Sequence, residues 1–178
     1  MNPMDYTIEK FISEKEIKDK IAKLADQINA DFDGKEIVAI CTLKGSFVFF
    51  SDLIRSLALP VRCEFLGLSS YGNQTTTSGE VKVTLDLNSQ IEGKHVLIVE
   101  DIVDSGITLQ FILKYLEARN PASISTAALL SKPDALKVDV DVEYVGFEIQ
   151  NQFVVGYGLD YAESLRGLPY IGILHLEE

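Results

Sequence analysis

Three carboxylates follow one short apolar segment of the chain. The segment 95–99 (HVLIV) is typical of a buried strand, and Glu100, Asp101 and Asp104 come within the next five residues. Carboxylates beside a buried strand can accept hydrogen bonds from the hydroxyls of a sugar, and one of them can transfer a proton. We therefore predict that Glu100 and Asp101 bind sugar hydroxyls and that Asp104 moves a proton.

The residues after these acids are suited to a phosphate group. Ser105, Gly106 and Thr108 stand where a helix is expected to begin. Gly106 permits a tight turn with inward backbone N–H groups, and a helix start adds unpaired donors and a positive dipole end. The two hydroxyls can donate to the same anion. The segment indicates a phosphate monoester site, and the alternative is a simple helix cap with Glu100 and Asp101 as solvated charges.

Other common site patterns are missing from the sequence. It contains no GxxxxGK[ST] segment, and Tyr161 stands where a third glycine would follow Gly156 and Gly158 in a dinucleotide-binding pattern. The histidines, His95 and His175, lie far apart. That spacing argues against a histidine-rich zinc site and against a Ser-His-Asp triad.

Length and charge narrow the class of protein further. The 178 residues suggest one domain, and 16 basic against 27 acidic side chains give a net charge of −11. Such a field repels polyanions, so we expect no nucleic-acid partner. Any anionic ligand must be held by local dipoles or by a metal ion. Without a signal pattern or an apolar run of membrane-spanning length, we expect a cytoplasmic protein that does not enter a membrane.

Alternating strands and helices are expected to position the candidate groups. Apolar residues at helical spacing follow a Ser13–Glu16 capping box, and they recur after Gly45 and again after Thr108. In the second helix Phe47 lies on the apolar side, where either the core or an interface between subunits could bury it. Strands are expected at 37–41, 61–68, 81–87, 95–99, 123–130, 144–147, 153–155 and 170–174. This order predicts an α/β fold with a mainly parallel sheet covered on both faces, in which ligands bind beyond the carboxyl ends of the strands.

One polar segment interrupts this pattern. Residues 69–79 (SSYGNQTTTSG) contain almost no side chain that could be buried. Such a composition predicts a mobile loop.

Several of these segments resemble a known family. The stretch VEDIVDSGITL resembles the phosphoribosyl pyrophosphate signature of the type I phosphoribosyltransferases. Residues 43–53 resemble the first loop and helix of the hypoxanthine-guanine phosphoribosyltransferases, residues 145–161 resemble their purine-binding hood, and residues 168–172 resemble the C-terminal segment of the bacterial members. The resemblance implies the type I phosphoribosyltransferase fold in a single domain over 1–178, with a hood formed by N-terminal residues and about 145–178.

The resemblance also implies a reaction. Members of the family transfer a 5-phosphoribosyl group from phosphoribosyl pyrophosphate to N9 of a 6-oxopurine, and they require Mg²⁺. The expected activity is purine salvage that forms IMP from hypoxanthine and GMP from guanine, with pyrophosphate as the other product. A metal ion fits a protein of net charge −11 that must hold a polyanionic leaving group.

Roles near the sugar follow from the same resemblance. Glu100 and Asp101 match the acids on the ribose 2′- and 3′-hydroxyls, and Asp104 matches the general acid or base beside purine N7. The residues that match the loop around the 5′-phosphate are Ser105, Gly106, Ile107 and Thr108, with Ile107 contributing its backbone N–H. The acids that match the surroundings of Mg²⁺, partly through water or substrate, are Glu100, Asp101 and Asp160.

Roles for the base and the pyrophosphate are implied in the same way. Lys44 and Gly45 match the pyrophosphate loop, in which a non-proline cis peptide precedes the lysine, and Arg166 matches an arginine on pyrophosphate. Lys132 matches the donor to purine O6. Phe153 matches the aromatic side chain that stacks on the base, and Val154 matches a residue whose backbone meets the base edge. The segment from Ser70 and Tyr71 matches the flexible catalytic loop.

Two alternatives and the assembly remain open at this point. A regulatory protein that senses phosphoribosyl pyrophosphate or a nucleotide without turnover would keep the same pocket, although the acid at 104 and the Lys44–Gly45 pair favour an enzyme. Xanthine is a third candidate base, and the sequence does not rank the three. The family implies a homodimer or homotetramer.

Overall fold

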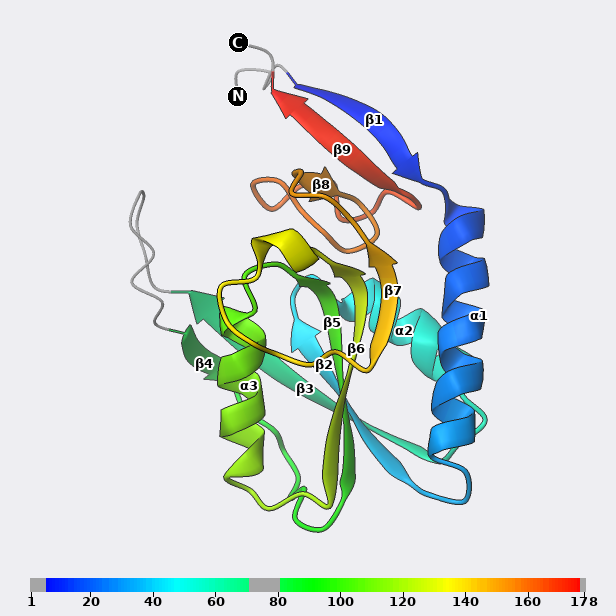
Figure 1. Ribbon diagram of the computed structural model, residues 1–178, viewed down its shortest axis with the longest axis vertical. Coiled ribbons are helices and arrows are strands. Elements are labelled where there is room, and N and C mark those ends of the chain that lie inside the picture. The colour runs from blue at the N-terminus through cyan, green and yellow to red at the C-terminus, as the bar shows by residue number, and fades with distance from the viewer. Residues whose placement is uncertain (1–5, 71–80, 177–178) are drawn as a thin grey trace.

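The computed structural model describes residues 6–70 and 81–176 and contains two β-sheets (Figure 1). The main sheet has the strand order β4-β3-β2-β5-β6-β7. Its strands are β2 (Ile37–Leu43), β3 (Val61–Ser70), β4 (Val81–Leu85), β5 (His95–Val103), β6 (Ser123–Ser131) and β7 (Tyr144–Glu148). All neighbours pair in parallel except β3 and β4. The expectation of a mainly parallel sheet is confirmed.

Helices cover both faces of this sheet. Figure 1 shows α1 (Glu14–Asp31) and α2 (Phe47–Ser56) on one side and α3 (Ile107–Glu117) on the other. Successive residues of β2 enter the two cores in turn, since Ile37 and Ala39 pack with α1 and α2, whereas Val38 and Ile40 pack with α3. Burial on both faces explains why the strands are almost continuously apolar. Among the described residues, no helix is long and apolar enough to span a membrane.

Local signals placed the helices well but oriented one of them incorrectly. The predicted capping box is present at α1, where Ser13 N–H donates to Glu16 Oε2 at 2.9 Å. In α2 the core alternative for Phe47 is wrong, because this residue is 45% exposed while Phe49 and Leu53 are fully buried. Two residues correspond to about 200° around a helix, so Phe47 and Phe49 point in nearly opposite directions.

A second, smaller sheet lies beyond the carboxyl ends of the main strands (Figure 1). It is antiparallel, with the order β1-β9-β8, and its strands are β1 (Tyr6–Ile12), β8 (Val154–Val155) and β9 (Ile171–Leu176). Residues far apart in the chain therefore share one sheet, since Tyr6 pairs with Leu176. β7 belongs to the main sheet, where it pairs with β6.

Strand β5 is longer than its apolar segment. We expected it to end at Val99, but it continues to Val103, because pairing with β6 extends through Glu100 opposite Ala128. The two acids thus lie within the strand and are held by its backbone. Strand β3 similarly runs to Ser70, into the segment that was expected to be a mobile loop. The rest of that loop, residues 71–80, lies outside the described residues.

Candidate active site

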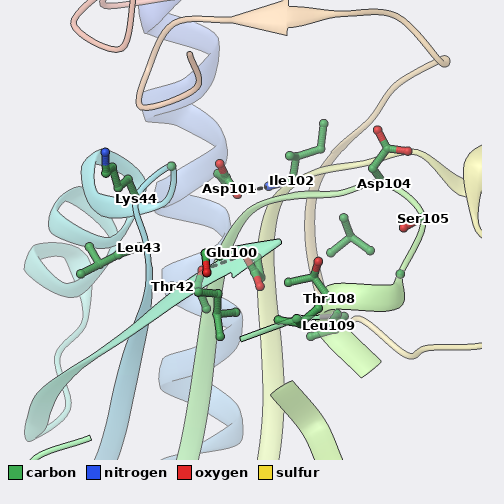
Figure 2. Close-up of a pocket in the computed structure, with 16 residues that line it drawn as sticks. Thr42, Leu43, Lys44, Glu100, Asp101, Ile102, Asp104, Ser105, Thr108 and Leu109 are labelled. Atoms are coloured by element: carbon green, nitrogen blue, oxygen red, sulfur yellow. Dashed lines mark hydrogen bonds between the residues drawn. The ribbon is translucent and has the colours of Figure 1, made fainter. Parts of the chain in front are cut away.

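A cavity of about 270 Å³ opens where β2 and β5 end, and Figure 2 shows its lining. The predicted site residues on its wall are Lys44, Gly45, Glu100, Asp101, Asp104, Ser105, Gly106 and Thr108. They come from two neighbouring strand ends and from the start of α3. The structure thus gathers the acids, the candidate phosphate loop and the Lys44–Gly45 pair around one space.

The carboxylates of Glu100 and Asp101 have different hydrogen-bond partners. Glu100 is only 7% exposed, and its Oε2 accepts a hydrogen bond from Thr42 Oγ1 at 2.7 Å. In the described part of the chain its other oxygen, Oε1, is buried and has no hydrogen-bond partner. Asp101 accepts a hydrogen bond from the Ile102 N–H at 2.8 Å, and its carboxylate lies against Gly45. A buried oxygen without a partner is costly unless a ligand supplies one.

The two acids hold their protons more strongly than ordinary carboxyl groups. Burial raises the pKa of Glu100 from 4.5 to about 8, with the neighbouring Asp101 adding to the rise and the Thr42 hydroxyl opposing it. Burial also raises the pKa of Asp101, to about 6, and the Ile102 N–H and Arg166 oppose that rise. A ligand that donates hydrogen bonds or brings positive charge would favour the ionised forms.

Replacing Glu100 by Gln is expected to stabilise the ligand-free protein above about pH 8 and to change little near pH 5. The folded protein keeps this proton up to about pH 8, whereas the unfolded chain loses it near 4.5. Unfolding therefore releases a proton between these values, and wild-type stability falls as pH rises through that window. The neutral amide removes this loss. Thermal unfolding across the range should show a gain of about 10 °C at the alkaline end.

The control for this measurement is Glu117→Gln on the exposed side of α3. It should follow the wild-type curve at every pH. Parallel curves for Glu100→Gln and the wild type would contradict a raised pKa at Glu100.

The start of α3 has the geometry expected of a phosphate site. Gly106 precedes the helix with φ 78°, a left-handed conformation that favours glycine. Its carbonyl accepts the first helical hydrogen bond, from Gln110 N–H at 2.9 Å. The Ile107 N–H donates a long hydrogen bond to Ser105 Oγ at 3.5 Å. The next backbone N–H groups, at Thr108 and Leu109, belong to residues that line the cavity, whereas Ile107 does not line it.

Asp104 and Lys132 form an ion pair at the edge of the cavity. Lys132 Nζ lies 2.8 Å from Asp104 Oδ2, and the lysine side chain is 8% exposed against 51% for the aspartate. The Lys132 N–H donates to the Val103 carbonyl at 2.9 Å, which fixes the end of β6 beside the end of β5. Two residues 28 positions apart are therefore held as a unit.

The pyrophosphate-loop candidates meet a second loop from the C-terminal part of the chain. The Leu43–Lys44 peptide bond is cis, as the resemblance implied. Lys44 Nζ lies 2.9 Å from Glu163, a residue that the sequence reasoning did not single out. Arg166 forms an ion pair with Asp160 at 2.8 Å. Its guanidinium also donates to the Gly158 carbonyl at 2.8 Å, so the basic groups already have anionic partners.

Among the described residues, Phe153 and Val154 do not line the cavity. Phe153 is 52% exposed, and its ring meets Tyr161 edge to face with the centroids 5.8 Å apart. Val154 is buried in β8. Ser70 ends β3, and Tyr71 lies outside the described residues. Their predicted roles in binding stay predictions.

Thr42 is the functional candidate that sequence reasoning missed. It lies in β2 next to Glu100 and lines the cavity (Figure 2). The available signal was a hydroxyl side chain directly after the apolar segment IVAIC and two residues before Lys44. Parallel neighbours bring their carboxyl ends together, but the sequence does not state which strands are neighbours.

Comparison with known proteins identifies the class first. The model of the phosphoribosyl transferase domain matches residues 10–162. A crystal structure of a hypoxanthine-guanine phosphoribosyltransferase from Bacillus anthracis superposes with a TM-score of 0.89 at 48% identity, over 93% of this chain and 97% of that one. The expected fold class, the type I phosphoribosyltransferase fold, is confirmed.

Two curated relatives identify the family more closely. The chain is 51% identical over 173 residues to the hypoxanthine-guanine phosphoribosyltransferase of Dictyostelium discoideum, covering 95% of this chain and 96% of that protein. It is 48% identical over 174 residues to the hypoxanthine phosphoribosyltransferase of Haemophilus influenzae, covering 96% and 97%. The chain therefore belongs to the hypoxanthine(-guanine) phosphoribosyltransferase family.

Proposed function

We propose that the protein transfers a 5-phosphoribosyl group from phosphoribosyl pyrophosphate to N9 of hypoxanthine, and to guanine as a second base, forming IMP or GMP and pyrophosphate. One observation carries the proposal: Glu100, Asp101 and the start of α3 at Gly106 line the same cavity. The acids suit the two ribose hydroxyls, and the free N–H groups suit the 5′-phosphate. Membership of the family supports the same reaction.

In this proposal the purine lies between the small sheet and the Asp104–Lys132 pair. Lys132 Nζ donates to purine O6, which favours 6-oxopurines because the 6-amino group of adenine offers hydrogens instead of an acceptor. Asp104 holds or moves the proton at purine N7. The half-exposed ring of Phe153 stacks on the base, and the backbone of Val154 meets its edge.

The pyrophosphate is assigned to Lys44, Gly45 and Arg166. Binding replaces the present contacts of Lys44 with Glu163 by contacts with phosphate oxygens. Such an exposed ion pair is weak, about 1 kcal/mol or less, so it opposes the exchange only slightly. In this arrangement Lys44 and Arg166 bind the leaving group close to Asp101, whose carboxylate lies against Gly45.

The acids of the cavity fit Mg²⁺ as a cofactor shared with the substrate. The buried Glu100 Oε1 has no partner within residues 6–70 and 81–176, and carboxylate oxygens are the ligands that Mg²⁺ prefers. The same residues contain no cluster of three or more potential protein ligands. The acids Glu100, Asp101 and Asp160 would therefore hold the ion partly through water and substrate oxygens. It would neutralise charge that develops on the departing pyrophosphate.

Further proposals concern the frame around the site. The small sheet serves as the hood, within a single domain, and the segment beginning Ser70–Tyr71 closes over the reacting sugar and excludes water. From the family resemblance we also propose a homodimer or homotetramer located in the cytoplasm.

A direct assay tests the proposed reaction. Purified protein is incubated with Mg²⁺, phosphoribosyl pyrophosphate and, separately, hypoxanthine, guanine, xanthine, adenine or uracil. IMP and GMP are the expected products, detected by chromatography. Tight binding of the sugar donor without any nucleotide product would instead indicate a sensor.

Replacing Lys132 by Met is expected to lower kcat/KM for hypoxanthine by about 100-fold, because the base loses the donor to its O6. The variant should fold, since Asp104 is half-exposed and water can hydrate its carboxylate. Steady-state kinetics with the base varied measure the effect. Lys114→Met, on the exposed side of α3, is the matched control and should behave as the wild type. Equal values for the two variants would remove Lys132 from base recognition.

A further inference from the structure

Within residues 6–70 and 81–176, one side-chain donor orients the Glu100 carboxylate. Thr42 Oγ1 lies 2.7 Å from Glu100 Oε2, while Glu100 Oε1 has no partner in the described part of the chain. A glutamate side chain has several rotatable bonds, so an unrestrained carboxylate would lose conformational freedom on binding a ligand. The contact with Thr42 removes much of that freedom beforehand.

Thr42 is itself held firmly. β2 and β5 run in parallel with Cys41 opposite Val99, so the next residues along, Thr42 and Glu100, are cross-strand neighbours. The Thr42 side chain is β-branched and therefore stiff at its first torsion. Its carbonyl accepts a hydrogen bond from Ser46 Oγ at 2.7 Å, which fastens the end of β2 to the start of α2. Figure 2 shows both side chains below Asp101.

We propose that Thr42 is a positioning residue, which fixes one oxygen of Glu100 so that the other oxygen is directed at the ribose hydroxyls. This inference rests on the proposed function, because it assumes that a ribose occupies the cavity. It assigns Thr42 no contact with the reacting atoms. Its effect should therefore depend on whether the ligand carries hydroxyls for Glu100 to bind.

Two variants isolate the hydroxyl of Thr42. Thr42→Val keeps the shape and the β-branch but removes the donor, and Thr42→Ser keeps the donor. The single hydroxyl hydrogen of Thr42 is shared with the Val99 carbonyl, 2.8 Å from Oγ1, which also loses this donor in the valine variant. The substitution could therefore also disturb β5. Comparing a ligand that has ribose hydroxyls with one that lacks them separates that disturbance from the effect on Glu100.

The experiment measures dissociation constants of two ligands by calorimetry, namely IMP and its 2′,3′-dideoxy form. For IMP, Thr42→Val should weaken binding by about tenfold, the scale of one hydrogen bond. For the dideoxy form, the same variant should bind as tightly as the wild type. Thr42→Ser should recover most of the loss with IMP. This pattern is expected only if the hydroxyl acts through the ribose-binding acid.

Each contrary result has a definite meaning. An equal loss of affinity for both ligands would show that Thr42 supports the site as a whole. No loss of affinity for either ligand would show that Glu100 needs no support. Either result would overturn the proposal. Wild-type protein is assayed for IMP formation in parallel. Failure of that assay contradicts the proposed reaction, whereas the ligand comparison is made without turnover and tests the positioning alone.

Discussion

Asp104→Asn is expected to lower kcat at least about 100-fold, because the amide cannot accept the proton that a general base takes in the transition state. The amide oxygen can still accept a hydrogen bond from Lys132, whose Nζ lies 2.8 Å from the aspartate. The lysine should therefore stay in place. Turnover of hypoxanthine at saturating phosphoribosyl pyrophosphate is the measurement.

A second variant separates proton transfer from anchoring. Asp104→Ala removes the partner of Lys132 altogether. If Asp104 moves a proton, the alanine and asparagine variants should lose similar amounts of kcat; if it only anchors Lys132, the asparagine variant should retain most of its activity. Asp134→Asn, exposed in the short helix that follows Lys132, serves as the control. Wild-type turnover in Asp104→Asn would end the assignment of a general base here.

Gly45→Ala is the second change with a large expected effect. A Cβ built on Gly45 would lie 1.6 Å from Asp101 Oδ2, so either the Asp101 carboxylate or the turn after β2 must move. Gly158 packs closely against the same turn, since a Cβ built on Gly158 would lie 2.1 Å from the Gly45 carbonyl oxygen. A displacement of about 1 Å in a reacting site can cost about 100-fold. We expect kcat/KM for phosphoribosyl pyrophosphate to fall by that factor.

Gly167→Ala is the matched control for this substitution. A Cβ on Gly167 would meet nothing within 4 Å, and the backbone there is not left-handed. The variant should therefore match the wild type in kinetics and in melting temperature. If Gly45→Ala also matched it, the close contact between Gly45 and Asp101 would have no functional weight.

Much of the fold could be predicted because its signals are local. Most strands of the main sheet are apolar runs, and the capping box of Ser13 and Glu16 indicates where α1 begins. The acids and the phosphate loop could also be predicted, since they are consecutive in the chain and follow β5 into α3. The position of the binding site then followed from the general rule that ligands bind beyond the carboxyl ends of parallel strands.

The rest depends on contacts between distant segments. Neither the Asp104–Lys132 pair nor the Thr42–Glu100 contact has a local signal, because each is created by the order of strands in the sheet. The length of β5 was underestimated for the same reason, since pairing with β6 outweighs the polar character of Glu100. Phe47 was misplaced because hydrophobicity alone does not reveal which side of a helix meets the sheet.

The pairing of β1 with β9 bears on how the chain is completed during synthesis. β1 is made before the strands of the main sheet, yet its partner is more than 150 residues away, since Tyr6 pairs with Leu176. Such a distant partner is costly in loop entropy and slow to find. During synthesis on a ribosome the main sheet can form before β9 is available to pair with β1. In pulsed hydrogen exchange, amides in β1 should become protected after those in β2, and earlier protection would refute this order.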